Sequence, residues 1–341
     1  MGKKDVLTKM YLGQNEIFAD AFNYYLFDGK SLIKPSDLSE KDITELSAIY
    51  KTGKLFASQK FRDVLRLSNI KRYGQTTLVL LGIEGQAAVH YAMPVRDYLY
   101  DALNYAAQVD DIKRNHEKAK DLSGAEKISG FSKKDHILPV ITLCICFDNN
   151  PWNGPRSLYD MFDDIPEEIL KYVNNYKLNL ITPNEINDFG RFNSELGTVL
   201  KFIQISDNKT LTRDILNSGE YENISTDTVN MINEYTGAKI STENAEGGRV
   251  NMGNAWKELM DDIRTKALTE GRTEGRIEGQ SKGEEKRLVK QICRKLRKGK
   301  NLAQIADDLE ENESNIKAFF DTAAAFAPDY DEDQVIKAMF G

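Results

Sequence analysis

The sequence predicts an α/β fold, a sheet flanked by helices, with a helical extension at its C-terminal end. Two segments, 77–83 and 136–148, are almost continuously apolar, which is typical of strands covered on both faces of a sheet. Residues 14–28 repeat apolar side chains at helical spacing, and Pro94 suits the first turn of a helix over 94–120. Periodicity alone does not separate a short buried strand from a buried helix segment, so 77–83 keeps that second interpretation.

The remaining elements follow in chain order. After the helix over 14–28 we expect a loop and a short segment over 34–50, then a two-stranded ribbon within 59–89. Between the helix over 94–120 and the strand over 136–148, residues 121–134 are polar and contain Gly and Ser, which predicts a loop. The later elements are a short helix over 158–162, a strand over 178–181 and three helices over 187–206, 208–217 and 225–236.

The ribbon carries the most informative side chains. Asp63 falls on its first strand, and Glu84-Gly85-Gln86 follows directly after the apolar run of the second. Because side chains alternate between faces along a strand, Glu84 and Gln86 point the same way. Asn69 and the run 71–75 supply turn residues between the strands. Two carboxylates and an amide are therefore expected to converge at one edge of the sheet.

These residue types suit a hard divalent cation. Mg²⁺ is typically held by one or two carboxylates together with waters and phosphate oxygens. An unpaired carboxylate at the end of a buried strand is costly, and a cation or a basic partner offsets that cost. A metal bound by Asp63 and Glu84 would lower the pKa of a bound water and stabilise charge on a phosphate.

The pattern resembles the PD-(D/E)XK nuclease superfamily. Within it, the closest likeness is to the Rpn-like recombination-promoting nucleases, also described as PD-(D/E)XK nuclease family transposases. The likeness rests first on Asp63 with Glu84-x-Gln86 and on the segment 90–100 with its Arg and aromatic residues. It is supported by Phe18 to Asn23 in the first helix and by the Glu-Gly-Arg repeats. The resemblance covers roughly residues 10 to 300. It implies a restriction-endonuclease-like core with a mixed central sheet.

The resemblance also implies roles for individual residues. Asp63 and Glu84 would bind Mg²⁺, with Mn²⁺ as a substitute, Gln86 would position water or phosphate, and Arg96 would steady the phosphate or Glu84. Asp20 or Glu16 on the first helix would reach the outer shell of the metal. Arg62 replaces the Pro of the superfamily name, and Gln86 replaces the usual Lys. Because an amide carries no charge, either catalysis would be weak or Lys60 or Arg96 would supply the missing positive charge.

Composition limits the other possibilities. The chain has 341 residues and a formal net charge of −7, which argues against nonspecific coating of nucleic acid. No run approaches 18 apolar residues and no apolar segment follows Met1–Asp5, so we expect a soluble cytoplasmic protein without a membrane span. Three cysteines are too few for a disulfide framework and lack metal spacing. No small-molecule cofactor is expected.

The C-terminal part carries its own signals. Residues 286–300 contain eight basic residues and no acid, and Lys290, Arg294, Arg297 and Lys298 are the expected DNA contacts. In the repeat, glycines stand at 271, 275, 279 and 283, which suits either a helix that packs in a homodimer or a flexible linker. Two short helices over 301–309 and 313–320 resemble a helix-turn-helix, although a helical oligomerisation or docking module fits equally.

The predicted organisation is a nuclease-like domain over 1–260, the repeat segment over 261–285 and a small basic helical module over 286–341. The leading hypothesis is a divalent-metal-dependent DNA endonuclease, which the resemblance associates with recombination, mobile elements or phage defence. The alternative is a catalytically degenerate nuclease fold that acts as a DNA-binding or oligomeric assembly protein. A scaffold assembled only through the repeat helix is a third hypothesis.

Overall fold

The computed structural model describes residues 2–40, 63–72 and 75–341. It divides into two compact units, Met1–Leu259 and Met260–Gly341. Each unit has its own cluster of buried apolar side chains. The boundary between the units falls within helix α10 (Met252–Leu296).

The first unit is built on a mixed five-stranded sheet with the strand order β1-β2-β3-β4-β5. Strands β1 to β3 pair antiparallel, whereas β3, β4 and β5 pair parallel, so the α/β class and the mixed sheet are confirmed. Strand β3 lies at the centre of the sheet, as its apolar run predicted. The strands are β1 (Leu38–Glu40), β2 (Val64–Arg72), β3 (Gln75–Gln86), β4 (Val140–Cys146) and β5 (Asn179–Ile181).

Strands β2 and β3 form the predicted ribbon. Their register pairs Val64 with Ile83 at one end and Arg72 with Gln75 at the other, which leaves residues 73–74, outside the described part of the chain, as the connection. Asn69, which we expected in the turn, instead lies within β2 opposite Leu78. The strand pairing therefore extends further along the ribbon than predicted, to Arg72 and Gln75.

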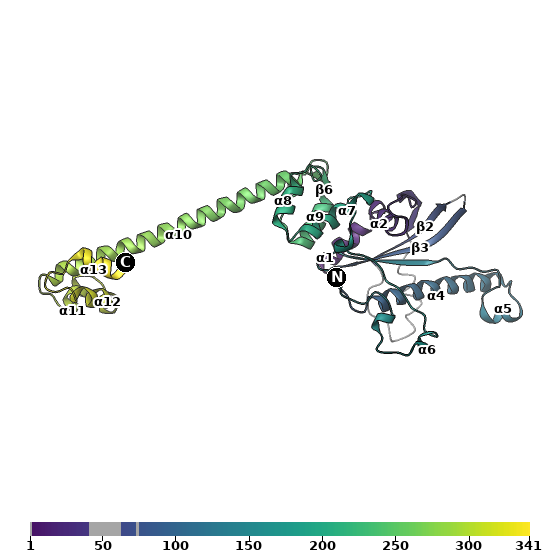
Figure 1. Cartoon of the computed structure of the whole chain (residues 1–341), viewed down its shortest axis with the longest axis horizontal. Helices are drawn as coiled ribbons and strands as arrows, with labels where there is room; N and C mark the ends of the chain where they lie inside the picture. The colour runs from purple at the N-terminus through teal and green to yellow at the C-terminus, as the bar shows by residue number, and fades with distance from the viewer. Residues whose placement is uncertain (1, 41–62, 73–74) are drawn as a thin grey trace. The chain divides into compact units, whose positions relative to one another are not determined.

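Helices cover both faces of the sheet (Figure 1). Successive side chains of β4 point alternately to one face and to the other. Leu143 and Ile145 join the larger core with α1 (Lys3–Leu12), α2 (Asn15–Phe27), α7 (Leu196–Ile205) and α9 (Thr226–Thr236). Cys144 and Cys146 point to the opposite face, where they are buried with Met93 at the start of α4 (Met93–Ala119). The predicted helix over 94–120 is confirmed, and it makes the crossover between the parallel strands β3 and β4.

The structure differs from the prediction in several segments. Helix α1 was not predicted, and α5 (Gly124–Ser129) lies inside the predicted loop over 121–134. The helix predicted over 187–206 starts only at Leu196, because the backbone N–H groups of Asn193 and Ser194 donate to Asp20 rather than within a helix. The other short elements are η1 (Pro35–Asp37), η2 (Tyr159–Met161), α6 (Glu167–Leu170), η3 (Pro183–Glu185), η4 (Phe189–Arg191), α8 (Lys209–Leu216), β6 (Ile224–Ser225) and β7 (Arg249–Val250).

The second unit is helical throughout its regular elements. The C-terminal part of α10 packs with α11 (Leu302–Leu309), α12 (Glu313–Ala324) and α13 (Glu332–Phe340) around Val289, Ile292, Ile305, Ile316 and Val335. The acidic segment near residue 330 begins α13, where the Asp331 carboxylate accepts hydrogen bonds from two backbone N–H groups. Such a cap satisfies donors that have no partner within the helix.

The Glu-Gly-Arg repeat lies within α10 and is helical. Residues 261–284 are exposed, and open space surrounds the positions where Gly271, Gly275, Gly279 and Gly283 would carry a Cβ. In the part of the chain that is described, no helix is both long and apolar enough to cross a bilayer.

Candidate metal and phosphate site

The ends of the ribbon bring Asp63, Glu84 and Gln86 together as the sequence predicted. Asp63 directly precedes β2, and its Oδ2 accepts a hydrogen bond of 2.8 Å from the backbone N–H of Gly85 on β3. Glu84 and Gln86 share a face of β3, since the Gln86 Nε2 donates to the Glu84 Oε1 at 3.2 Å. These residues and Arg96 line one pocket of about 320 Å³.

Glu84 is the most constrained carboxylate of the pocket. Its side chain is only 1% exposed, and Arg96 forms an ion pair with its Oε1. The other oxygen, Oε2, is buried without a hydrogen-bond partner among the residues that the structure describes. Burial, reinforced by the nearby charge of Asp63 and opposed by Arg96, raises the pKa of Glu84 to about 8.

Asp63 shares this environment. Burial raises the pKa of its carboxyl group above the ordinary value, while the hydrogen bond from Gly85 and the charge of Arg96 oppose the shift. Two carboxylates with raised pKa values in one pocket are more easily ionised together when a cation is bound between or beside them. The electrostatics of the pocket therefore favour a positive ligand.

Arg96 extends from the first turn of α4 toward the end of β3. Its Nε donates to the Tyr100 hydroxyl at 2.9 Å while its terminal nitrogen binds Glu84. Burial lowers the pKa of the guanidinium, but the charge of Glu84, the hydrogen bond to Tyr100 and the charge of Asp63 together outweigh that effect, so the pKa is raised. Arg96 is thus a positive charge at the wall of the pocket and pairs with Glu84, while its role in steadying Glu84 or a phosphate stays a prediction.

The donor set fits a hard divalent cation in chemistry but is incomplete as a protein cage. Glu84 offers a buried oxygen that accepts no hydrogen bond from the described part of the chain, and Asp63 offers a second carboxylate. Across residues 2–40, 63–72 and 75–341, no group of three or more His, Cys, Asp or Glu residues is arranged to hold a metal ion. Magnesium commonly uses one or two carboxylates and completes its shell with water and substrate phosphate.

The structure adds side chains to the pocket that the sequence did not indicate. Asp5 and Thr8 come from α1, and Tyr235 comes from α9. The hydroxyl groups of Thr8 and Tyr235 lie 2.6 Å apart, and burial raises the pKa of Tyr235 to about 12, so its phenol stays neutral. The local signal for Asp5 was its position in the first turn of a helix, whereas no local pattern marks Tyr235.

Gly85 has a role of its own, because α1 crosses β3 closely at this point. A Cβ at Gly85 would lie 2.6 Å from the Cγ2 of Thr8 and 3.0 Å from the Cδ1 of Leu12. The glycine in Glu84-Gly85-Gln86 therefore allows α1 to form one wall of the pocket.

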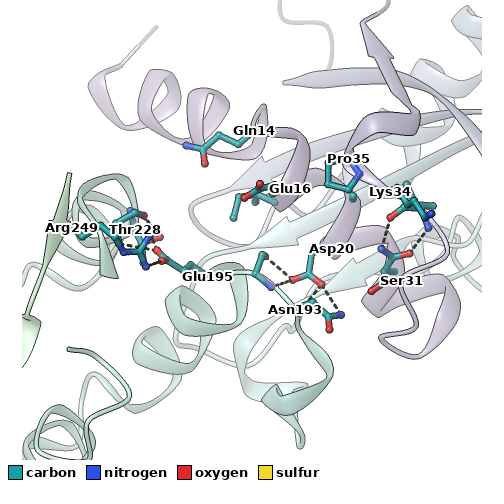
Figure 2. Close-up of a pocket in the computed structure, with 16 residues that line it drawn as sticks. Gln14, Glu16, Asp20, Ser31, Lys34, Pro35, Asn193, Glu195, Thr228 and Arg249 are labelled. Carbon is teal, nitrogen blue, oxygen red and sulfur yellow. Dashed lines mark hydrogen bonds and ion pairs between the residues drawn. The ribbon is translucent and has the colours of Figure 1, made fainter. Parts of the chain in front are cut away.

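Asp20 and Glu16 do not reach this pocket, so the structure does not support their predicted place in an outer shell. They line a different hollow of about 610 Å³ beside α2 (Figure 2). There the Asp20 carboxylate accepts hydrogen bonds from the backbone N–H groups of Asn193 and Ser194, both at 2.9 Å. The face of α2 that carries Asp20 is directed at the segment before α7, which explains its different location. Lys60 and Arg62 lie outside the described residues.

The expected DNA contacts lie in the second unit, and their surroundings differ from one residue to the next. Lys290 and Lys298 are exposed. Arg294 forms an ion pair with Glu332 at 3.1 Å, and Arg297 donates to the backbone carbonyls of residues 329 and 330 as well as to Glu332.

No protein-family model, curated protein or solved structure matches this chain. The family and the function inferred from the sequence therefore stay predictions, and the site itself is the basis for a proposal.

Proposed function

We propose that the chain is a divalent-metal-dependent DNA endonuclease of the PD-(D/E)XK type. The observation that supports this most strongly is the buried Oε2 of Glu84, which lacks a hydrogen-bond partner among the described residues and shares its pocket with Asp63. A buried carboxylate oxygen in this condition costs free energy unless a proton or a cation occupies it.

Asp63 and Glu84 would hold the metal, with Mg²⁺ as the expected ion and Mn²⁺ as a substitute. When bound, such an ion lowers the pKa of a coordinated water and stabilises negative charge on phosphate oxygens. The protein's own contribution is to remove the carboxylates from bulk water and to fix their direction through Gly85 and Arg96.

Gln86 and Arg96 would act on the phosphodiester and the attacking water. The Gln86 amide now donates to the Glu84 Oε1 and to the Gly85 carbonyl, so reorienting it would allow it to position a water by hydrogen bonds. Arg96 would provide the positive charge that an amide lacks, and its guanidinium suits phosphate oxygens.

The test is a plasmid-nicking assay in Mg²⁺, in Mn²⁺ and in EDTA. Asp63→Asn should abolish the metal-dependent conversion of supercoiled to open-circular plasmid while far-UV circular dichroism stays unchanged. Asp111→Asn provides a matched control, because Asp111 is exposed on α4 and pairs only with Arg114 among the described residues. Undiminished nicking by Asp63→Asn would contradict the proposal.

One observation favours the alternative, a degenerate nuclease fold that binds DNA or assembles without cleaving it. Arg96 already neutralises Glu84, and Gln86 supplies no charge, so the pocket would persist as an internal ion pair. This alternative predicts salt-dependent DNA binding by the unmodified protein with no nicking in either metal.

A further inference from the structure

The basic segment over 286–300 covers the end of α10 and the turn after it, and its side chains form two groups with different surroundings. Arg287, Lys290, Arg294 and Lys298 are all exposed. Arg287, Lys290 and Arg294 lie on α10, where at 3.6 residues per turn they fall within roughly a sixth of a turn of one another and extend over about 10 Å of the helix. Lys298 follows in the turn after Leu296, the last residue of α10. We call these four residues the basic ridge.

Arg297 belongs to the other group. Its guanidinium donates to the Asp329 carbonyl at 2.9 Å and to the Tyr330 carbonyl at 2.7 Å, and it pairs with Glu332 at 3.4 Å. These contacts hold the segment that leads into α13, and they occupy the donors that a phosphate would need. Arg297 is therefore a structural residue of the second unit.

The ridge has few acidic neighbours to neutralise it. Among the described residues, no acidic side chain forms an ion pair with Arg287, Lys290 or Lys298, and Glu332 pairs with Arg294. Arg294 keeps 66% of its side chain exposed, so this single pair lies in water. An exposed ion pair of this kind contributes little and yields to a competing polyanion.

Helix α13 runs beside the same stretch of α10. Glu332 at its first turn contacts Arg294 and Arg297, and near its end the Phe340 ring lies 5.9 Å from the Nζ of Lys286. Val335, between them, is fully buried in the core of the unit. The helix that supplies Glu332 is thus fixed in place by packing, whatever its ion pair does.

We propose that the basic ridge is a binding surface for the phosphate backbone of duplex DNA and that Glu332 is a built-in counter-ion that competes for Arg294. The charge of the ridge complements a polyanion, and its helical part spans about three phosphates of one strand. No side chain of the ridge needs to read a base, so binding is independent of sequence. The surface lies outside the pocket of Asp63 and Glu84, and the proposal holds whether or not that pocket cleaves DNA.

The test measures binding of the full chain to a fluorescein-labelled duplex by fluorescence anisotropy in EDTA, across a series of NaCl concentrations. Arg287→Gln, Lys290→Gln and Arg294→Gln should each lower the slope of log K against log[NaCl] by about one. Lys266→Gln removes the same charge from an exposed position of α10 outside the ridge and should leave the slope unchanged. Circular dichroism verifies that each variant is folded.

Glu332→Gln should tighten binding by up to about fivefold, because Arg294 is released from its counter-ion. Asp333→Asn is the matched control, since it removes one negative charge at the next position of α13, where no ion pair to the ridge exists among the described residues. Equal effects of Glu332→Gln and Asp333→Asn would overturn the counter-ion role.

Loss of slope in Lys266→Gln as large as in Lys290→Gln, or the absence of salt-dependent binding by the unmodified chain, would overturn the ridge itself. Because no metal is present, failure of this test is distinct from failure of cleavage.

Discussion

Two buried carboxylates in the first unit have opposite surroundings. Asp20 is 3% exposed, and both of its oxygens accept hydrogen bonds, from the backbone and side chain of Asn193 and from the backbone and hydroxyl of Ser194. Glu84 is 1% exposed, yet only its Oε1 has partners among the described residues.

The difference distinguishes an acid with a structural role from the acid that we propose to be functional. Hydrogen bonds from fixed backbone donors stabilise the charge of Asp20, and they also join α2 to the segment before α7. At Glu84 the protein removes a carboxylate from water, and among the described residues no donor reaches its Oε2, so a proton or a cation at that oxygen would offset the cost of burial. Burial alone therefore does not distinguish the two acids, whereas the unsatisfied oxygen of Glu84 among the described residues does.

The largest expected effect is on cleavage. Glu84→Gln should reduce Mg²⁺-dependent nicking by about 100-fold or more, because a neutral amide cannot hold the metal that stabilises charge on the phosphate. Plasmid nicking measures this effect, with Glu278→Gln on the exposed part of α10 as the control. Equal nicking by the Glu84 variant and the control would break the comparison.

For stability, substitution of Asp20 is expected to have a larger effect than substitution of Glu84. Asp20→Asn should lower the free energy of unfolding by about 2–4 kcal/mol, because the amide group places donors against the N–H groups of Asn193 or Ser194. Glu84→Gln should cost less, since a neutral side chain avoids the burial of a charge. Urea unfolding in EDTA measures both, with Asp28→Asn as an exposed control that should change stability by roughly 0.5 kcal/mol or less. A larger loss in Glu84→Gln than in Asp20→Asn would contradict the assignment.

The raised pKa of Glu84 predicts a pH dependence of metal binding. Below about pH 8 the metal must displace a proton, so the apparent affinity should fall by about tenfold per pH unit as the pH decreases. The stability of the metal-free protein has the opposite pH dependence: it decreases as the pH rises. The contribution of Glu84 to folding is fully present below pH 4.5 and is lost as the pH rises through about 8. Calorimetric titration between pH 6 and 9 checks the first statement, and a flat affinity would exclude a protonated Glu84.

A smaller effect tests how α1 completes the pocket. Gly85→Ala should destabilise the first unit by about 1–3 kcal/mol, because the new methyl group meets Thr8 Cγ2. Adding Thr8→Ser removes that methyl group and keeps the hydroxyl near Tyr235, so the double variant should recover part of the loss. Thermal unfolding followed by circular dichroism measures the set. Strictly additive effects would show that the contact with Thr8 is not the cause.

The pocket residues at the ends of β2 and β3 were predictable from the sequence, whereas those on α1 and α9 were not. Asp63, Glu84 and Gln86 follow from alternation along a ribbon, a rule that acts over a few residues, and Arg96 followed from the resemblance. Asp5, Thr8 and Tyr235 reach the pocket through long-range packing of α1 and α9, which leaves no periodic signal in the sequence. Asp20 misled for the same reason: its sequence neighbours resemble a nuclease helix, but its hydrogen bonds are made with residues more than 170 positions away. In the second unit, α13 was not predicted, because its N-cap at Asp331 and its buried Val335 specify the helix only together.

The most direct test of the central claim is equilibrium binding of Mn²⁺, followed by electron paramagnetic resonance at pH 8.5. The account predicts a saturable site in the unmodified protein and in Asp20→Glu, and loss of that site in both Asp63→Asn and Glu84→Gln. Saturable binding that survives Glu84→Gln unchanged, or the absence of any saturable site in the unmodified protein, would contradict the claim that the unsatisfied oxygen of Glu84 serves a cation.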